Sequence, residues 1–600
     1  MPLLAAFGGS SGDIVFGGVP PPNPLFFTLK CHEPQIEQPC WKKIKHVPRY
    51  FSQIINMDID QHSLGLQKTD IKHLALLALA WVAAMIAINP TGNFPLNDDW
   101  AYAKDVWYLS EQSILKLDDW PAMTRLTQIF WGAGVCKVLG FSHEALRYST
   151  MLLGFAGLVA AWFIFLEMGA SRRLATLGTA VLMFNPMYFS LSATFMTDVP
   201  FLALFLWSIY FFLKSANSGK LRHVVWATVF TLLATLVRQM GMAGPLAFAA
   251  VWLYRQGVNW RSLAVALTPL ALAVAAYIGF TKWYEVTQGL PESYGSLGKL
   301  AKRFGDKGFF WECLKRIGLL LFYLGFFLSP VTVLLLRRHL RSANTALRWW
   351  TAGITLVLAV TFFFAWKHYP LGNMVYNLGL GPKTLKDAAF WLNVSPMLSN
   401  SALNATKMVG VILGVIFLLN LVPSVVRGFK VAGTARVQAV FIWTFLVAYT
   451  GFLLTELYFL DRYHMVLVPF LLAVLVQGHD FVFGKRQVVA AGIFLVLMAG
   501  YATTGTHDYI SWNRARWRAL DYLTKEKGVK PNQIDGGFEF NGWYKPGPKD
   551  NGPWKSWWWV DKDEYVVAFG DIRVFTKQKG FPFERWLPPG VDSVYVLKHD

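Results

Sequence analysis

The sequence has few charged residues for its length. Only 15% of its 600 residues are Asp, Glu, Lys or Arg, whereas soluble globular chains carry about 25%. Hydrophobic residues make up 54% of the chain, and they gather in long, nearly uncharged runs. A soluble multidomain protein would need a more polar surface, and a disordered chain would be less hydrophobic. Both are excluded, and the composition predicts a polytopic membrane protein.

Cysteine is also scarce. The four cysteines, Cys31, Cys40, Cys136 and Cys313, form no Cys-x-x-Cys pair, so neither a disulfide framework nor a zinc site is expected. The net charge of +20 would suit a nucleic-acid partner. Most Lys and Arg residues, however, lie in short loops between apolar runs, where they mark the cytoplasmic side of a membrane. We therefore expect no nucleic acid as a partner.

Thirteen stretches are candidates for membrane-spanning helices, because a span needs about 20 apolar residues to cross about 30 Å of hydrocarbon. They cover residues 72–89, 145–168, 174–192, 198–213, 222–238, 242–255, 262–281, 314–336, 349–366, 408–426, 437–458, 464–480 and 487–504. We predict an all-α polytopic membrane domain of about 13 transmembrane helices over residues 71–504.

The short loops between these stretches alternate in charge. Every second loop is basic, as at Arg172 and Arg173, whereas the loops around Thr197, Met240 and Asp461 are nearly free of Lys and Arg. Basic loops stay in the cytoplasm. We therefore predict a multi-pass integral membrane protein with a cytoplasmic N-terminus and an extracytoplasmic C-terminus, and we expect a bacterial inner or plasma membrane. Two longer outer loops, 282–313 and 367–407, carry Lys and Arg against this rule, so either the topology changes there or these cations have a function.

Both ends of the chain differ from the apolar part. Residues 1–70 are rich in Pro and Gly and then mixed polar, which predicts a disordered cytoplasmic tail. A true start near Met57 is an alternative. Residues 505–600 are polar and aromatic, with a helix-like stretch at 512–527 followed by strand-like stretches. They predict a small extracytoplasmic α/β domain.

The two strand-like stretches of this C-terminal domain are residues 564–569 and 593–597. Between the helix-like stretch and the first of them lies a tryptophan-rich run, Trp554–Val560. Tryptophan suits a sugar-stacking surface and a membrane interface. A role in the core of the domain and in its seat on the membrane is the alternative that we favour.

Acidic residues follow the first span, in an outer loop predicted at residues 90–144. Asn97, Asp98, Asp99 and Trp100 form an acidic pair among apolar and aromatic residues. Carboxylates packed against a membrane bundle are rare and usually functional. Helix capping is the alternative, because Asn97 or Asp98 is a suitable N-cap for a helix that starts at Asp99.

A second acidic position opens the fourth span. Asp198 lies between Thr197 and Pro200, which is also a plausible helix start. Capping would explain one carboxylate there, but it does not explain why the topology brings Asp98, Asp99 and Asp198 to one outer face.

Two arginines lie on the same predicted face. Arg238 ends the fifth span and Arg462 follows Asp461 in a late loop. Each has an ordinary explanation, which is snorkelling to the interface or an ion pair, for Arg462 with Asp461 or Glu456. A site that handles a lipid phosphate would need such guanidinium groups, because Arg binds phosphate oxygens bidentately.

The order of these motifs resembles the GT-C superfamily of polyprenyl-phosphate-sugar glycosyltransferases, in particular its family 39 and ArnT-like (PMT-like) branch. The resemblance covers roughly residues 72–504. It rests on these motifs: Asn97-Asp98-Asp99 in the first outer loop, Leu146-Arg147, Asn185-Pro186, Thr197-Asp198-Val199-Pro200, and Arg462-Tyr463 before Pro469. The predicted C-terminal domain agrees with the resemblance, because members of this family often carry a C-terminal extracytoplasmic domain.

The resemblance implies an inverting glycosyl transfer from a polyprenyl-phosphate sugar to an extracytoplasmic glycolipid, polysaccharide or protein. Asp98 is the expected general base, Asp99 is the second candidate for that role, and Asp198 is a further catalytic carboxylate. The implied groups that bind the donor phosphate are Arg238, Arg462, Lys383 and Tyr463. No cofactor is firmly implied; the three aspartates could hold Mg²⁺ or Mn²⁺, but relatives imply no obligatory metal.

Some positions depart from the ArnT-like pattern. A basic residue normally follows the acidic motif, where this chain has Ala101, with Lys104 further along, and the stretch Asp118–Ala122 replaces a lysine-containing Pro-Pro segment. Aminoarabinose transfer to lipid A is therefore not indicated. The sequence also lacks the extra luminal domain material of the protein O-mannosylating enzymes, so the acceptor stays open.

Two other functions fit a many-span protein. An outer-leaflet polysaccharide ligase or polymerase would use a large late loop, here residues 367–407 with Lys367, His368 and Lys383. A transporter or flippase would carry charges in mid-span and repeated broken halves, whereas here the charges gather at outer ends and no internal repeat is evident.

Overall fold

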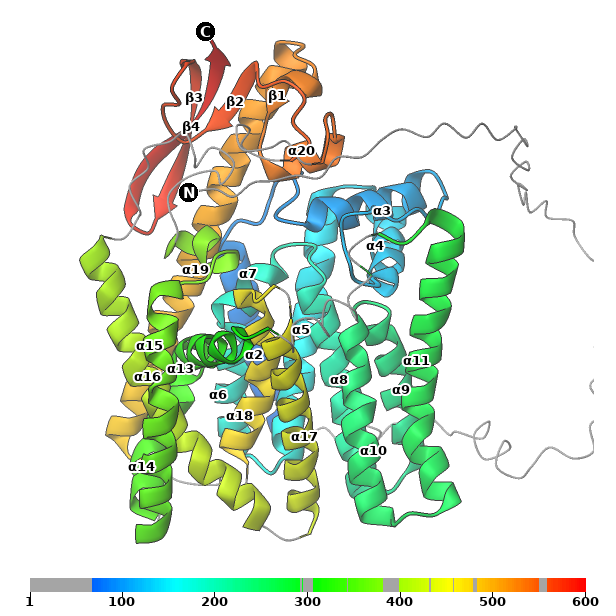
Figure 1. Cartoon of the computed structure of the whole chain (residues 1–600), viewed down its shortest axis with the longest axis vertical. Helices are drawn as coiled ribbons and strands as arrows, with labels where there is room; N and C mark the ends of the chain where they lie inside the picture. Colours follow the sequence, from blue (N-terminus) through cyan, green and yellow to red (C-terminus); the bar gives the residue numbers. More distant parts are fainter. Residues whose placement is uncertain are drawn as a thin grey trace, which may run out of the picture. The chain divides into compact units, whose positions relative to one another are not determined.

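The computed structural model describes residues 67–291, 294, 306–342, 344–380, 399–430, 433–456, 458–477, 483–549 and 558–600. The predicted N-terminal tail lies outside these residues except for its last four, and so does Lys383. Most of the described chain is helical, and one small sheet lies at its C-terminal end (Figure 1).

The helices of the membrane part follow the predicted spans. They are α2 (Lys68–Ala87), α5 (His143–Glu167), α6 (Arg172–Met183), α7 (Pro186–Ser192), α8 (Asp198–Ser218), α9 (Leu221–Thr235), α10 (Ala243–Gln256), α11 (Trp260–Gln288), α13 (Phe309–Ser342), α14 (Thr345–Ala359), α15 (Thr361–Ala365), α16 (Asn400–Lys430), α17 (Thr434–Thr455), α18 (Leu467–Val476) and α19 (Lys485–Asp521). Short 3-10 or π turns are η1 (Gln239–Met242), η3 (Trp366–His368), η4 (Tyr376–Leu380), η6 (Asp461–Val466), η7 (Tyr522–Glu526) and η8 (Pro531–Gln533).

Among the described residues, nine helices are long and apolar enough to cross a membrane, or ten if α6 and α7 count as one bent span. The other three predicted spans contain α9, α10 and α18, which have 15, 14 and 10 residues. The turn η1 leads directly into α10, and η6 leads directly into α18. The chain is a multi-pass membrane protein.

The bend between α6 and α7 measures 65° and has a local cause. The side chain of Asn185 accepts hydrogen bonds from the backbone N–H groups of Met187 and Tyr188, and Pro186 occupies the first position of α7. Proline cannot continue the preceding helix but starts a new one well. This break ends one span just before the loop that leads to Asp198.

Helices α5, α8 and α13 form the buried centre of the bundle, whereas α2, α11 and α19 lie at its periphery. The close approach of α5 and α8 requires Gly157, because a Cβ atom there would lie 3.0 Å from the Cα of Ala203. The central helices thereby fix where their ends lie, and with them the loops that carry the acidic residues.

The first outer loop contains two helices, α3 (Asp99–Glu111) and α4 (Leu126–Leu139). They lie at the same end of the bundle as the C-terminal sheet and α20 (Phe538–Tyr544) (Figure 1). The side chain of Arg125 fixes the turn before α4, because it pairs with Asp105 at 2.6 Å and donates hydrogen bonds to three backbone carbonyl groups. The turn before α4 is therefore held in place by a buried ion pair and by hydrogen bonds within the loop.

The C-terminal domain is built on the last span. Helix α19 runs without a break through residue 504, where the domain boundary was predicted, and its C-terminal half packs on the sheet. The strands are β1 (Ile534–Asp535), β2 (Tyr565–Ala568), β3 (Phe575–Trp586) and β4 (Pro589–His599), in the order β1-β2-β4-β3. Strands β1 and β2 are parallel, and the other pairs are antiparallel. Both predicted strand-like stretches are strands in β2 and β4.

Candidate functional site

Asp98 occupies the N-cap position of α3, but its side chain makes no capping hydrogen bond within the described chain. One carboxylate oxygen, Oδ1, accepts a hydrogen bond of 3.1 Å from the indole Nε1 of Trp120. The other, Oδ2, lies 3.3 Å from both terminal guanidinium nitrogens of Arg462. Capping therefore does not account for this carboxylate, whose side chain is 17% exposed.

Asp198 is the first residue of α8 and is almost fully buried. Its Oδ2 lies 2.7 Å from a terminal nitrogen of Arg238, and its Oδ1 lies 4.0 Å from Nε of Arg462. Nε of Arg238 donates a hydrogen bond of 2.8 Å to Oγ1 of Thr197. The end of the fifth predicted span is thus joined to the start of the fourth.

Arg462 lies between the two carboxylates and is 5% exposed. Asp461 is not its ion-pair partner: the Asp461 carboxylate accepts backbone N–H groups, from Arg462 at 2.7 Å and from Val375 at 2.7 Å. Burial raises the pKa of Asp461 to about 7, against these N–H donors, which lower it. Asp461 therefore anchors the segment around Val375 beside the site and leaves the guanidinium of Arg462 to Asp98 and Asp198.

Asp99 points away from this network. Its Oδ1 accepts the backbone N–H of Leu96 at 2.6 Å, and its Oδ2 accepts that of Phe195 at 3.0 Å. Burial raises the pKa of Asp99 to about 8, although the two N–H donors oppose the shift. Asp99 ties the first outer loop to the loop before α8. Its role as the second candidate for the general base stays a prediction.

Two other predicted site residues are Tyr463 and Lys383. The Tyr463 ring lies 5.8 Å from the guanidinium carbon of Arg462, within the range of a cation–π contact. Lys383 lies outside the described residues. Asp98, Asp198, Arg238 and Arg462 thus form one network, which we call the carboxylate–arginine network, with Tyr463 beside it.

Trp120 is the contact that the sequence reasoning missed. It belongs to Asp118-Asp119-Trp120, which repeats the Asp-Asp-Trp of residues 98–100 within the same loop. In the fold the rings of Trp100 and Trp120 lie 6.5 Å apart. The repeated tripeptide was a signal for a paired structural role, although only the tertiary structure shows which indole reaches Asp98.

The tryptophan-rich run of the C-terminal domain lies only partly within the described residues, which include Trp558 and Trp559 but not residues 554–557. The Trp559 ring lies 5.1 Å from that of Trp120, and the Trp558 ring lies 4.8 Å from it. Trp559 is buried. These two rings pack against the first outer loop.

The three aspartates do not form a metal site. Across the part of the chain that the structure describes, no group of three or more His, Cys, Asp or Glu side chains could hold a metal ion. Asp99 uses both oxygens on backbone N–H groups, while Asp98 and Asp198 each face an arginine. The arrangement is that of paired carboxylates and guanidinium groups rather than of a ligand set.

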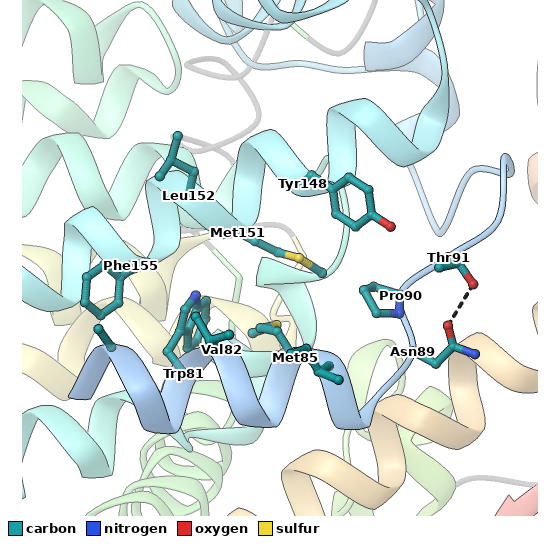
Figure 2. A pocket seen from close by; sticks show the side chains of 12 residues that line it. Trp81, Val82, Met85, Asn89, Pro90, Thr91, Tyr148, Met151, Leu152 and Phe155 are labelled. Carbon is teal, nitrogen blue, oxygen red and sulfur yellow. Dashed lines mark hydrogen bonds between the residues drawn. The ribbon is translucent and has the colours of Figure 1, made fainter. Parts of the chain in front are cut away.

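Figure 2 shows a groove of about 690 Å³ between α2 and α5, away from this network. Its wall is apolar, with Trp81, Met85, Met151 and Phe155, and its outer end is formed by residues 89–91. None of the network's four side chains lines it. The groove therefore lies between a peripheral helix, α2, and a central one, α5, and is not part of the candidate site.

The network has a definite chemical capacity. The Asp98 side chain is the more accessible carboxylate, at 17% exposure against 2% for Asp198, so it is the one that a ligand hydroxyl can reach. Nε of Arg462 is buried and has no hydrogen-bond partner among the described residues. The Asp98 carboxylate, which can accept a proton, is therefore in direct contact with the Arg462 guanidinium group, which can donate hydrogen bonds.

Comparison with known proteins gives similarity in structure only. No protein-family model matches the chain, and no curated protein is significantly similar to it in sequence. ArnT from Cupriavidus metallidurans bound to undecaprenyl phosphate is 12% identical with a TM-score of 0.38, and the match covers 87% of this chain and 97% of that one.

Two further solved structures are similar. The archaeal oligosaccharyltransferase AglB from Archaeoglobus fulgidus, in complex with an inhibitory peptide and a dolichol-phosphate, is 14% identical (TM-score 0.37; 79% of this chain, 59% of that one). The S. cerevisiae protein O-mannosyltransferase Pmt1–Pmt2 complex bound to the sugar donor is 16% identical (TM-score 0.31; 38% of this chain, 34% of that one). This chain covers less than two thirds of either.

Identities of 12–16% and TM-scores below 0.5 do not decide an activity. The proposal below depends on the chain's own residues.

Proposed function

We propose that the protein is a membrane glycosyltransferase that moves a sugar from a polyprenyl-phosphate donor to an extracytoplasmic glycolipid, polysaccharide or protein by inverting transfer. The observation that carries the proposal is the contact of Asp98 with Arg462, which also lies beside Asp198. Asp98 is the general base, and Arg462 and Arg238 hold the donor phosphate. Tyr463 and Lys383 stay candidates for donor binding.

The reaction requires one proton transfer and one exchange of bonds at the sugar. The acceptor hydroxyl gives its proton to Asp98, and its oxygen forms a bond to the anomeric carbon. The bond from that carbon to the phosphate oxygen breaks, and its electron pair leaves with the polyprenyl phosphate. A carboxylate within hydrogen-bond reach of the acceptor is suited to this step.

The contact between Asp98 and Arg462 couples the two events. When Asp98 takes up the proton it loses its negative charge, and Arg462 keeps its positive charge. The site therefore becomes more positive as the leaving phosphate becomes more negative. Preorganised charge of this kind stabilises the transition state more than the ground state.

Asp198 has a supporting role in this scheme. Its carboxylate is buried between Arg238 and Arg462, and a buried charge of one sign keeps its opposite partners charged and in place. Asp198 thus holds the two guanidinium groups, while the more exposed Asp98 meets the acceptor.

The proposal is tested by transfer with purified protein in detergent, radiolabelled polyprenyl-monophosphate sugars and a crude membrane glycan extract. Wild type should release label from the lipid, and Asp98→Asn should lose about 10²–10⁴-fold in rate, the usual contribution of a general base. Asp198→Asn should also be strongly impaired.

A matched control is Asp119→Asn in the same outer loop, where the carboxylate is 73% exposed and pairs with Lys545. This variant should transfer at the wild-type rate. Undiminished transfer by folded Asp98→Asn would remove Asp98 from the role of base. No release by folded wild type with any donor would point to the ligase or transporter alternatives.

A further inference from the structure

The turn that carries Asp98 is contacted by the C-terminal domain. Asn97, the residue before Asp98, has a φ of +59°, a left-handed conformation that Asn tolerates better than most residues. Its backbone N–H donates a hydrogen bond of 2.9 Å to Oε1 of Glu539 in α20. A side chain more than 400 residues away thus fixes the backbone next to the proposed base.

Glu539 is itself held firmly. Its Oε2 accepts a hydrogen bond of 2.6 Å from Arg516, which is 1% exposed and lies on α19. Arg516 also donates two hydrogen bonds to the carbonyl oxygen of Gly536, at 2.8 and 2.6 Å. The Glu539 carboxylate therefore bridges the buried Arg516 of α19 and the first outer loop.

The same domain supports the second contact of Asp98. The Phe538 ring lies 5.6 Å from the ring of Trp120, whose indole donates to Asp98. Gly542 of α20 lies against Trp100, since a Cβ atom there would be 2.4 Å from that ring. Helix α20 is therefore fitted closely to the loop at several independent points.

We infer that Glu539 is a positioning residue for the transfer reaction, which it serves by holding Asn97 and thereby the carboxylate of Asp98. This inference rests on the proposed function. It gives the C-terminal domain a direct part in the geometry of the proton transfer, in addition to the selection of an acceptor that its extracytoplasmic location suggests.

The test compares Glu539→Ala and Glu539→Gln with wild type in the transfer assay. Glu539→Ala loses the acceptor for the Asn97 N–H, so kcat should fall at least tenfold while KM for the donor stays within twofold, because Arg238 and Arg462 are unchanged. Glu539→Gln keeps a carbonyl oxygen for that N–H, so its kcat should stay within a few fold of wild type. Hydrogen exchange in the segment 94–102 should speed up in Glu539→Ala.

The matched control is Asp508→Asn, because Asp508 also accepts two backbone N–H groups, from Trp586 and Leu587 inside the C-terminal domain. It should change neither kcat nor the exchange of residues 94–102. If Glu539→Ala cannot be purified in a folded form, Glu539→Gln carries the test, with a loss of a few fold in kcat and unchanged donor KM.

Several outcomes would overturn the inference. Unchanged kcat in folded Glu539→Ala would do so while leaving the proposed function intact, and so would a rise in KM at constant kcat, which would assign Glu539 to binding. An equal loss in Asp508→Asn would reduce the effect to general stability of the domain. An inactive wild type would remove the proposed function and this inference together.

Discussion

Two neighbouring carboxylates in this protein have different surroundings and therefore different roles. Asp98 faces Trp120 and Arg462 and is partly exposed. Asp99 is buried and accepts two backbone N–H groups. Although they are adjacent in sequence at the start of α3, the Asp98 carboxylate can be reached by a ligand, whereas the Asp99 carboxylate joins two loops.

Asp99 gives the stability of the protein a pH dependence. An aspartate titrates near pH 4 in an unfolded chain, and burial raises the folded-state pKa of Asp99 to about 8. The contribution of Asp99 to the free energy of unfolding is fully present below about pH 4. It is lost as the pH rises through about 8, by at most about 1.4 kcal/mol per pH unit. The advantage in Tm of wild type over Asp99→Asn should therefore shrink between pH 5 and pH 8 in detergent micelles.

The control for this measurement is Asp571→Asn, whose carboxylate is 84% exposed. Its difference in Tm from wild type should be small at every pH. A constant difference between wild type and Asp99→Asn over the whole range would mean that Asp99 is ionised throughout.

Arg462 should matter chiefly for the donor. Arg462→Ala removes a guanidinium group that is 5% exposed, and a hydrogen bond to a charged group contributes about 1.5–3 kcal/mol. Donor KM should rise about 10- to 100-fold. Arg518→Ala, which removes an exposed guanidinium bound to the carbonyl of Pro582, should leave it unchanged; if Arg462→Ala only unfolds the protein, Arg462 is structural.

At the scale of elements, the ends of helices bring the network together. Asp98 precedes α3 and Asp198 begins α8, and both carboxylates lie at the positive ends of helix dipoles. Arg238 follows α9 and Arg462 lies in η6 before α18. Four chain segments that are distant in sequence meet because short turns interrupt the bundle at one end.

The bundle itself depends on close helix contacts. A Cβ atom at Gly325 of α13 would lie 2.5 Å from the backbone nitrogen of Gly414 in α16, and small residues allow such contacts in membrane bundles. Gly325→Ala should lower the free energy of unfolding by about 1–3 kcal/mol through overpacking, which is measured by thermal unfolding in detergent.

Gly451→Ala on α17 is the corresponding control. An added Cβ atom there meets no heavy atom within 4 Å in the described part of the chain, and Ala favours a helix by about 1 kcal/mol over Gly. This variant should be neutral or slightly more stable. Equal destabilisation by both substitutions would contradict a special contact at Gly325.

At the scale of the whole molecule, the C-terminal domain lies at the end of the bundle that holds the carboxylate–arginine network (Figure 1). Helix α19 joins the last span to this domain without interruption. The predicted orientation places both on the outside and the basic loop at Arg255 in the cytoplasm.

Labelling of intact cells tests this orientation. In a background with the four native cysteines replaced by serine, Lys598→Cys should react with a membrane-impermeant maleimide from outside. Arg255→Cys should react only after the membrane is permeabilised, because basic loops are retained in the cytoplasm. The reverse pattern would place the candidate site on the cytoplasmic side and contradict transfer to an extracytoplasmic acceptor.

The sequence by itself determined the class of fold and the identity of the four network residues. Long apolar runs require helices that cross a membrane, because a helix satisfies its own backbone hydrogen bonds there. Charged residues are rare within such runs, so the ones at their ends are easily recognised in the sequence. Asp98, Asp198, Arg238 and Arg462 could therefore be chosen before any contact was known.

Only the tertiary structure decided which of these groups meet. Pairing depends on side-chain direction and loop path, which local patterns do not encode: Asp99 turns to the N–H of Phe195, Asp461 turns to Val375, and the indole of Trp120 reaches Asp98. The contact of Glu539 with Asn97 joins residues 442 positions apart. Contacts of such separation follow from the packing of the whole chain, so no motif in the sequence could have predicted them.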